Sequence, residues 1–232
     1  MVHPIVQPVL YQQVADRLRQ MIQEGDLPAG SWIDEVRLTQ ILGISRTPLR
    51  EALKVLDSEG LVRLEPRRGC FVNELSIEDL NDIFPLMAML EGRCAFEAAR
   101  KATATSLIEL EPLHARLQAQ AKQGDIKVYY ALNAEIHMAI QALADNRWLS
   151  ELIDSLRNLL SLSRYKSLQS PGRLEESCAE HLAIFEAIKQ RDGRRAQEIT
   201  EQHLMRQLSV LHELAQAADT SEATTENENE PI

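Results

Sequence analysis

Cysteines, aromatic residues and long apolar runs are all scarce in this 232-residue sequence. Its three cysteines, Cys70, Cys94 and Cys178, are odd in number and widely spaced, which excludes a disulfide framework and a CxxC site and indicates a reducing compartment. Aromatic residues make up 4%, too few for a β-sandwich rich in Tyr and Trp. No apolar run approaches the roughly 18 residues of a membrane helix, and the N-terminus lacks the pattern of a signal peptide. We therefore expect a soluble, cytoplasmic protein with no membrane partner.

Positive charge is also in short supply, because 25 Lys and Arg face 35 Asp and Glu, a formal net charge of −10. This balance excludes a histone-like protein that binds nucleic acid through general cationic charge. Hydrophobic residues make up 44%, enough to bury a core, and the length fits one large domain or two modest ones.

The first part of the chain is predicted to be helical up to about residue 59. Residues 1–9 contain two prolines and no hydrophobic period, so we expect a flexible N-terminus there. Helical periodicity then begins at Leu10 and ends at Gly25. A second helix is predicted over 34–42, and a third begins after an N-cap at Ser45.

A β-hairpin follows these helices. Two short apolar segments, 61–64 and 70–72, flank a turn that carries Arg67 and Arg68 at its tip. Three helices and a hairpin in this order are the layout of a winged helix-turn-helix, which we assign to residues 10–73.

The rest of the chain is predicted to be a six-helix antiparallel bundle, so the fold class is mainly α. The six amphipathic segments lie at about 76–101, 104–122, 125–144, 147–168, 173–191 and 194–216. They form a second domain over residues 76–216. Residues 219–232 are acidic, contain almost nothing apolar and are expected to be a disordered tail.

The third helix has one apolar and one cationic face. Its apolar face consists of Leu49, Ala52, Leu53 and Leu56. Arg46, Arg50 and Lys54 follow one another at four-residue intervals on the opposite face. Cations in line on one helix suit insertion into the major groove of DNA, where arginine can bond guanine O6 and N7.

Neighbouring residues extend this surface. Ser45 and Thr47 supply hydroxyls for a phosphate or a base edge, and Arg37 can reach the same backbone. At the hairpin tip, Arg68 can enter the minor groove while Gly69 lets the backbone come close.

Local charge favours the same interpretation. From residue 37 to residue 69 there are seven cations and four anions, a balance of 7 − 4 = +3 in a chain of −10. The alternative is a solvated helix face with ordinary surface arginines.

The segment LGISRTPLREALKVLDSEGLVRLEPRRGCFV (42–72), with LRQMIQEGDLPAGSWIDEVRLTQ before it, resembles the winged helix of GntR-type bacterial transcription regulators. The resemblance implies a homodimer bound to double-stranded DNA at a pseudo-palindromic operator. It also implies DNA contacts by Arg37, Arg46, Thr47 and Arg50, with Arg68 and Gly69 in the wing.

Three histidines lie on or beside the apolar faces of predicted helices in the second domain, namely His137, His181 and His203. Three neutral imidazoles from neighbouring helices can form a site for Zn²⁺ or a similar metal. Alternatively, each is a hydrogen-bonded core residue. His3, His114 and His212 are assigned to the tail or the surface.

Six helices after such a winged helix resemble the FCD effector domain of the FadR-like branch. The resemblance implies a divalent metal, Zn²⁺ or else Ni²⁺ or Mn²⁺, held by Asn133, His137, His181 and His203. Asn133 stands where the family more often has Asp, which removes an anionic ligand and lowers the expected metal affinity. Met87 stands where the family often has an arginine that pairs with an organic-acid effector. Other cations nearby in the sequence are Arg93, Arg147 and Arg164.

We therefore predict a transcription regulator, not an enzyme, whose operator affinity is controlled by a small metabolite, an organic acid that the metal can help to bind. One alternative is a metal-dependent, hydrolase-like helical enzyme that uses carboxylates such as Glu135 and Glu180. The sequence has no HExxH, GxSxG, P-loop or dinucleotide-binding motif to support it. A second alternative is a metal-responsive regulator without an organic effector.

Overall fold

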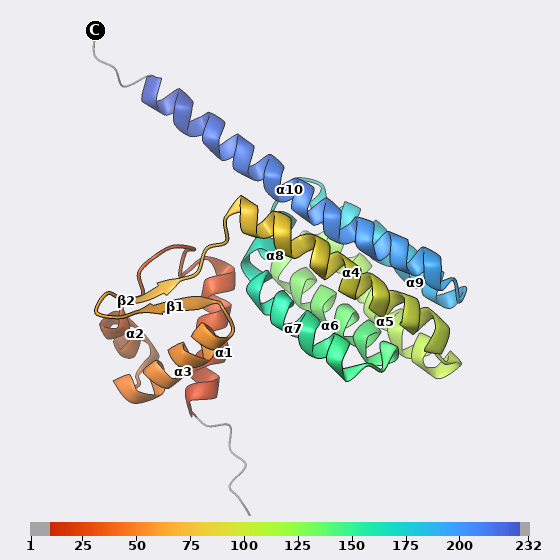
Figure 1. Cartoon of the computed structure of the whole chain (residues 1–232), viewed down its shortest axis with the longest axis horizontal. Coiled ribbons are helices and arrows are strands. Elements are labelled where there is room, and N and C mark those ends of the chain that lie inside the picture. The colour runs from red at the N-terminus through yellow and green to blue at the C-terminus, as the bar shows by residue number, and fades with distance from the viewer. Residues whose placement is uncertain (1–9, 228–232) are drawn as a thin grey trace, which may run out of the picture. The chain divides into compact units, whose positions relative to one another are not determined.

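The computed structural model describes residues 10–227, which form two compact units (Figure 1). The first unit contains the residues up to Glu74 together with Asn158–Leu162, and the second contains the others. The segment 1–9, predicted to be flexible, lies outside the described residues. Within the described part of the chain, no helix is both long and apolar enough to cross a membrane.

The first unit is a winged helix-turn-helix, as the sequence predicts. Its elements are α1 (Leu10–Glu24), α2 (Glu35–Leu42), α3 (Arg46–Ser58), β1 (Val62–Glu65) and β2 (Gly69–Val72). The two strands pair antiparallel, with Val62 opposite Val72 and Glu65 opposite Gly69. Their side chains and the helices share one apolar core, which includes Leu18, Leu53 and Cys70.

Polar residues occupy the N-cap positions of α2 and α3. The Asp34 carboxylate accepts hydrogen bonds from the backbone N–H groups of Val36 and Arg37, both at 3.0 Å, and so caps α2. Ser45 occupies the N-cap position of α3, as predicted, but its side chain makes no capping hydrogen bond. The hydroxyl of Ser45 is therefore not needed to hold the helix.

The described residues after the hairpin form seven helices rather than the six predicted. They are α4 (Ile77–Lys101), α5 (Ala104–Gln123), α6 (Ile126–Ala144), α7 (Arg147–Leu159), α8 (Ser161–Leu168), α9 (Arg173–Lys189) and α10 (Gly193–Asn227). The additional helix arises because the segment predicted as one helix over 147–168 is interrupted at Leu160. Neither proline nor glycine occurs at this position, so the sequence carries no local signal for the break.

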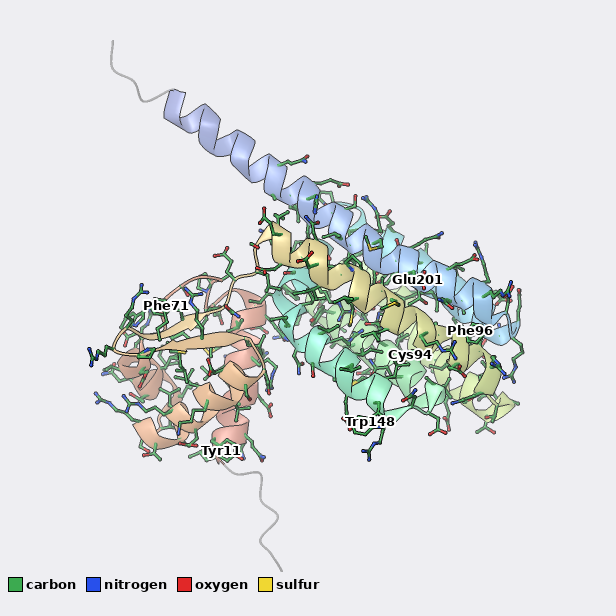
Figure 2. All side chains as sticks on the ribbon, in the orientation of Figure 1. Tyr11, Phe71, Cys94, Phe96, Trp148 and Glu201 are labelled. Atoms are coloured by element: carbon green, nitrogen blue, oxygen red, sulfur yellow. The ribbon has the colours of Figure 1, made fainter. Side chains whose placement is uncertain are left out.

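The longest contact in the second unit is between α4 and α10, which lie side by side in opposite directions (Figure 1). His212 Nε2 near the end of the contact bonds Asn81 Oδ1 at 2.7 Å. In the middle, a Cβ at Gly92 would come 2.7 Å from Cγ of Glu201, a residue labelled on α10 in Figure 2. Gly92 therefore permits the close approach of these two helices.

The end of the chain differs from the prediction. Residues 219–227, expected to be disordered, continue α10 as far as Asn227, and residues 228–232 lie outside the described part. No proline or glycine occurs after Gly193 within this helix, so nothing in the sequence stops it at residue 216.

Replacing the α2 cap is expected to destabilise the first unit. In Asp34→Ala two backbone N–H groups lose their acceptor, which costs about 1 kcal/mol of unfolding free energy. Ser45→Ala is the matched control, because it changes an N-cap side chain that makes no capping bond. Urea unfolding followed by circular dichroism measures both, and equal stability of the two variants would contradict the assignment.

Candidate functional site

The cationic face of α3 is turned to solvent, while its apolar face is buried in the core. Every side chain predicted to meet DNA is exposed, and the backbone position Gly69 is partly covered. The exposed set consists of Arg37, Ser45, Arg46, Thr47, Arg50, Lys54 and Arg68.

Weak ion pairs hold three of these cations at the surface. The pairs are Arg50 with Glu35 at 3.0 Å, Lys54 with Glu51 at 2.9 Å and Arg68 with Glu65 at 2.5 Å. Arg37 and Arg46 form no ion pair with another residue in the range 10–227. Exposed pairs of this kind contribute about 0–1 kcal/mol, so a phosphate can replace the carboxylate at little cost.

A cleft of about 310 Å³ brings part of this set together. Its lining includes Arg46 and Arg50 from α3, and Arg67, Arg68 and Gly69 from the hairpin. Arg67 and Gly69 both have positive φ angles, +64° and +105°, which turn the tip of the hairpin tightly. Guanidinium groups from a helix and a wing thus converge on one concave surface, an arrangement suited to a polyanion.

The second unit encloses a cluster of three histidines. His137 comes from α6, His181 from α9 and His203 from α10, and all three are buried. One ligand nitrogen from each lies within 4.8 Å of the other two. Sequence positions far apart in the chain are therefore close enough to share one cation.

A buried carboxylate orients the first of these imidazoles. The Glu91 side chain accepts a hydrogen bond from His137 Nδ1 and a second from Arg157 Nη1 at 2.6 Å. Because Nδ1 is occupied, the free nitrogen of His137 is Nε2, which has no hydrogen-bond partner in the structure. Carboxylates that hold the outer nitrogen of a metal-binding histidine in this way are common in metal sites.

The same arrangement recurs at the third histidine. Glu180 accepts hydrogen bonds from His203 Nδ1 and from Arg173 Nη2, the latter at 2.8 Å. The Nε2 atom of His203 contacts the Gln207 side-chain amide at 2.8 Å. That amide must turn away before Nε2 can bind a cation.

The remaining donors are buried and unpartnered. Neither ring nitrogen of His181 has a hydrogen-bond partner, and neither does the amide oxygen of Asn133, which lies one turn before His137 on α6. Buried polar atoms without partners are costly in a folded protein. A divalent cation of the zinc type would bind one nitrogen of His181 together with the free Nε2 of His137, so the residues present fit such a metal.

Three residues of this region were missed or misplaced by sequence reasoning. His114 is not on the surface but buried, stacked on Phe185 with a centroid distance of 4.3 Å. Its position is set by packing between α5 and α9, which the sequence does not show. Arg157 and Arg173 were not considered. Arg157 did carry a signal, because it follows the buried Ile153 by four residues on the same helix face.

The other three cations named from the sequence differ in burial. Arg93 and Arg147 are exposed and lie over the rings of Phe96 and Trp148. Arg164 on α8 is buried, and its Nε and Nη2 atoms have no hydrogen-bond partner.

Burial sets the protonation of the cluster. It lowers the pKa of His137 to about 3, and it also lowers the pKa values of His181 and His203. Burial alone would raise the pKa of Glu91, but Arg157 and His137 outweigh it and hold that pKa well below its usual range. Neutral imidazoles beside an ionised carboxylate are the forms that bind a metal.

These pKa shifts predict acid sensitivity of the metal-free protein. Unfolded histidines take up protons near pH 6.5, whereas the three buried imidazoles do not, so stability is lost as the pH falls below about 6.5. The expected loss is up to about 1.4 kcal/mol per pH unit for each histidine.

Urea unfolding in chelator at about pH 7.5 and about pH 5.5 measures this slope. His137→Gln should reduce it, because this variant lacks one of the three buried imidazoles. A free energy of unfolding that is the same at both pH values would show that the cluster is not held neutral by burial.

Known proteins resemble this chain over both the winged helix-turn-helix unit and the unit that contains the histidine cluster. The sequence matches the gntR family of bacterial regulatory proteins over residues 10–72 and the FCD domain over residues 82–206. The transcriptional repressor RspR of Escherichia coli is 30% identical over 200 residues, 85% of this chain and 86% of its own length. The Bacillus subtilis protein YdhC, named as an HTH-type transcriptional regulator, is 27% identical over 197 residues, 84% of this chain and 86% of its own.

Solved structures share the fold. Escherichia coli McbR/YncC matches with a TM-score of 0.78 at 24% identity, over 90% of this chain and all (100%) of that one. A GntR regulator from Rhodococcus matches with a TM-score of 0.70 at 21% identity, over 87% of this chain and 96% of its own. The family matches fall on both units of the fold, and the chain therefore belongs to the GntR family of bacterial transcription regulators, in the FadR-like branch that carries an FCD domain.

Proposed function

We propose that this regulator binds a pseudo-palindromic operator as a homodimer, and that an anionic metabolite held with a divalent metal in the helical unit controls its affinity for DNA. The observation that carries the proposal is the convergence of three buried imidazoles in a unit that also buries Arg164, whose Nε and Nη2 atoms have no hydrogen-bond partner. The relatives are named as transcription regulators, which gives the hydrolase-like alternative no support.

His137, His181 and His203 would hold the metal, with Asn133 as a fourth, neutral donor. Imidazole ligands suit Zn²⁺ and also Ni²⁺, and the amide oxygen of Asn133 tolerates Mn²⁺. Because Asn133 brings no charge, metal affinity should be lower than with an aspartate. The bound metal would supply positive charge and open coordination positions for a ligand oxygen.

The buried arginines near the cluster favour an anionic effector. They are Arg157, which pairs with Glu91, Arg173, which pairs with Glu176 and Glu180, and Arg164. The Nε and Nη2 atoms of Arg164 have no hydrogen-bond partner, and Glu91, whose charge acts on Arg164, is already bonded to Arg157. Burial lowers the pKa of Arg164 to about 10, so it is still charged at neutral pH.

Buried N–H groups without acceptors are costly, and a ligand carboxylate would accept hydrogen bonds from those of Arg164. Arg164 would thus pair with the organic-acid effector, as an arginine often does in the family at the position where this chain has Met87.

Control of DNA binding follows from differential affinity. A ligand shifts the balance between two arrangements of the dimer only by as much as it prefers one of them. Dimerisation is expected because one winged helix covers only half of a two-fold operator.

Removing a DNA-reading arginine should weaken operator binding. Arg46→Ala and Arg50→Ala are each expected to cost roughly 1–3 kcal/mol for a lost bidentate contact with guanine. The probe is the tightest-binding duplex selected from a random-sequence pool, and mobility shifts measure affinity. Arg17→Ala, which removes an exposed cation on α1, is the matched control. Unchanged affinity in both test variants would overturn the DNA assignment.

Two variants separate the metal from the effector. Elemental analysis should find stoichiometric metal in the wild-type protein and in His212→Ala, but not in His137→Ala, because only the last loses a ligand. Arg164→Met should keep the metal yet lose thermal stabilisation by a panel of sugar acids and hydroxy acids.

Equal metal content in His137→Ala would leave three hydrogen-bonded core histidines as the explanation. Metal-dependent DNA binding that no acid of the panel changes would favour the metal-responsive regulator.

A further inference from the structure

Trp32 is an unusual residue in the first unit, because this large aromatic side chain is 56% exposed. It lies between α1 and α2, outside the cationic face of α3. Large aromatic side chains gain most when they are covered, so an exposed indole fixed in place is a candidate contact for a partner.

The backbone fixes Trp32 beside the hairpin. Its two neighbours bond to β2 on either side: Ile33 N–H donates to Cys70 O at 2.8 Å, and Ser31 O accepts from Val72 N–H at 2.9 Å. Trp32 itself forms an antiparallel bridge with Phe71, which is labelled on the hairpin in Figure 2. Trp32 is therefore a one-residue extension of the sheet and not part of a loose loop.

The indole lies directly against the tip of the hairpin. A Cβ atom at Gly69 would come within 2.8 Å of Trp32 Nε1, so only glycine leaves room for the ring at this place. The φ of +105° at Gly69 also requires glycine. The indole of Trp32 and the tip of the wing at Gly69 therefore lie in direct contact, and a displacement of one would move the other.

Trp32 also lines the cleft that collects the arginines. The charged residues that line the cleft with it are four arginines, two from α3 and two from the wing, and two acids at the start of α2: Arg46, Arg50, Arg67, Arg68, Asp34 and Glu35. No residue in the range 10–227 accepts a hydrogen bond from the indole N–H. Asp34 caps α2 and Glu35 pairs with Arg50, so the cleft still offers more cations than free carboxylates to a ligand. A flat apolar ring with a free donor in such a cleft matches a sugar–phosphate backbone, which offers apolar deoxyribose faces and phosphate acceptors.

We propose that Trp32 contacts the DNA backbone between the recognition helix and the wing, with its ring against a deoxyribose and its N–H donating to a phosphate. Such a contact positions the wing and carries no sequence information. The inference rests on the DNA-binding role of the first unit and is independent of the metal and the effector.

Fluorescence tests the contact directly. The chain has two tryptophans, so Trp148→Phe leaves Trp32 as the only indole. Titration of this full-length variant with a duplex selected from random DNA should quench and shift the Trp32 emission at the concentration at which the mobility shift appears. Emission that does not change while the duplex binds would overturn the proposal.

Affinity measurements supply the second readout. Trp32→Ala should weaken binding roughly tenfold, at the low end of what aromatic contacts to nucleic acid contribute. Because no base is read, the loss should be similar for the selected duplex and for a scrambled one. Trp32→Phe keeps a ring against Gly69 without the N–H donor and should lie between wild type and Trp32→Ala, which keeps the test valid if the alanine variant does not fold.

The control is Trp148→Ala, which changes the other exposed indole and should bind as the wild type does. A loss confined to the selected duplex, or wild-type affinity in Trp32→Ala, would overturn the proposal. Failure of the DNA assignment itself would look different, because Arg46→Ala and Arg50→Ala would then also bind as the wild type does.

Discussion

A carboxylate buried inside a helical bundle must be compensated, and Glu91 meets this requirement with partners from two other helices. Its side chain on α4 bonds Arg157 of α7 and His137 of α6, and it is 3% exposed. Removing one partner of such a buried pair leaves an uncompensated charge, at a cost of about 3–5 kcal/mol. The register of three helices is thereby tied to the orientation of one imidazole. Glu180 on α9 makes the same kind of contacts, because its carboxylate pairs with Arg173 and with His203 of α10.

The arginines of the two candidate sites are exposed in the first unit and buried in the second, and this difference sets the cost of leaving their charge unpaired. In the first unit Arg46 and Arg50 are exposed, and the ion pair between Arg50 and Glu35 lies at the surface. Solvent and salt screen their charge, and a phosphate can replace the Glu35 carboxylate as the partner of Arg50 at little cost. In the second unit Arg157 and Arg164 are enclosed, where an unpaired charge is far more costly. In the proposed function, the same side chain would bind a polyanion at the surface and a small anion in the interior.

Local sequence signals were sufficient for much of the fold. The apolar periodicity of α3 and the hairpin around Gly69 both depend on residues a few positions apart. Signals failed where packing decided the outcome. The break at Leu160 has no glycine or proline, and His114 is buried only because α9 places Phe185 against it.

The sequence by itself determined the winged helix-turn-helix and the side on which its cations lie, because residues spaced by four share one face of a helix wherever that helix is placed. It also singled out His137, His181 and His203, since each interrupts an apolar face. Only the tertiary structure decided that these three meet and that Arg157, 66 residues from Glu91 in sequence, pairs with it. Contacts over such separations depend on how whole helices pack, and the periodicity within one helix contains no information about its neighbours.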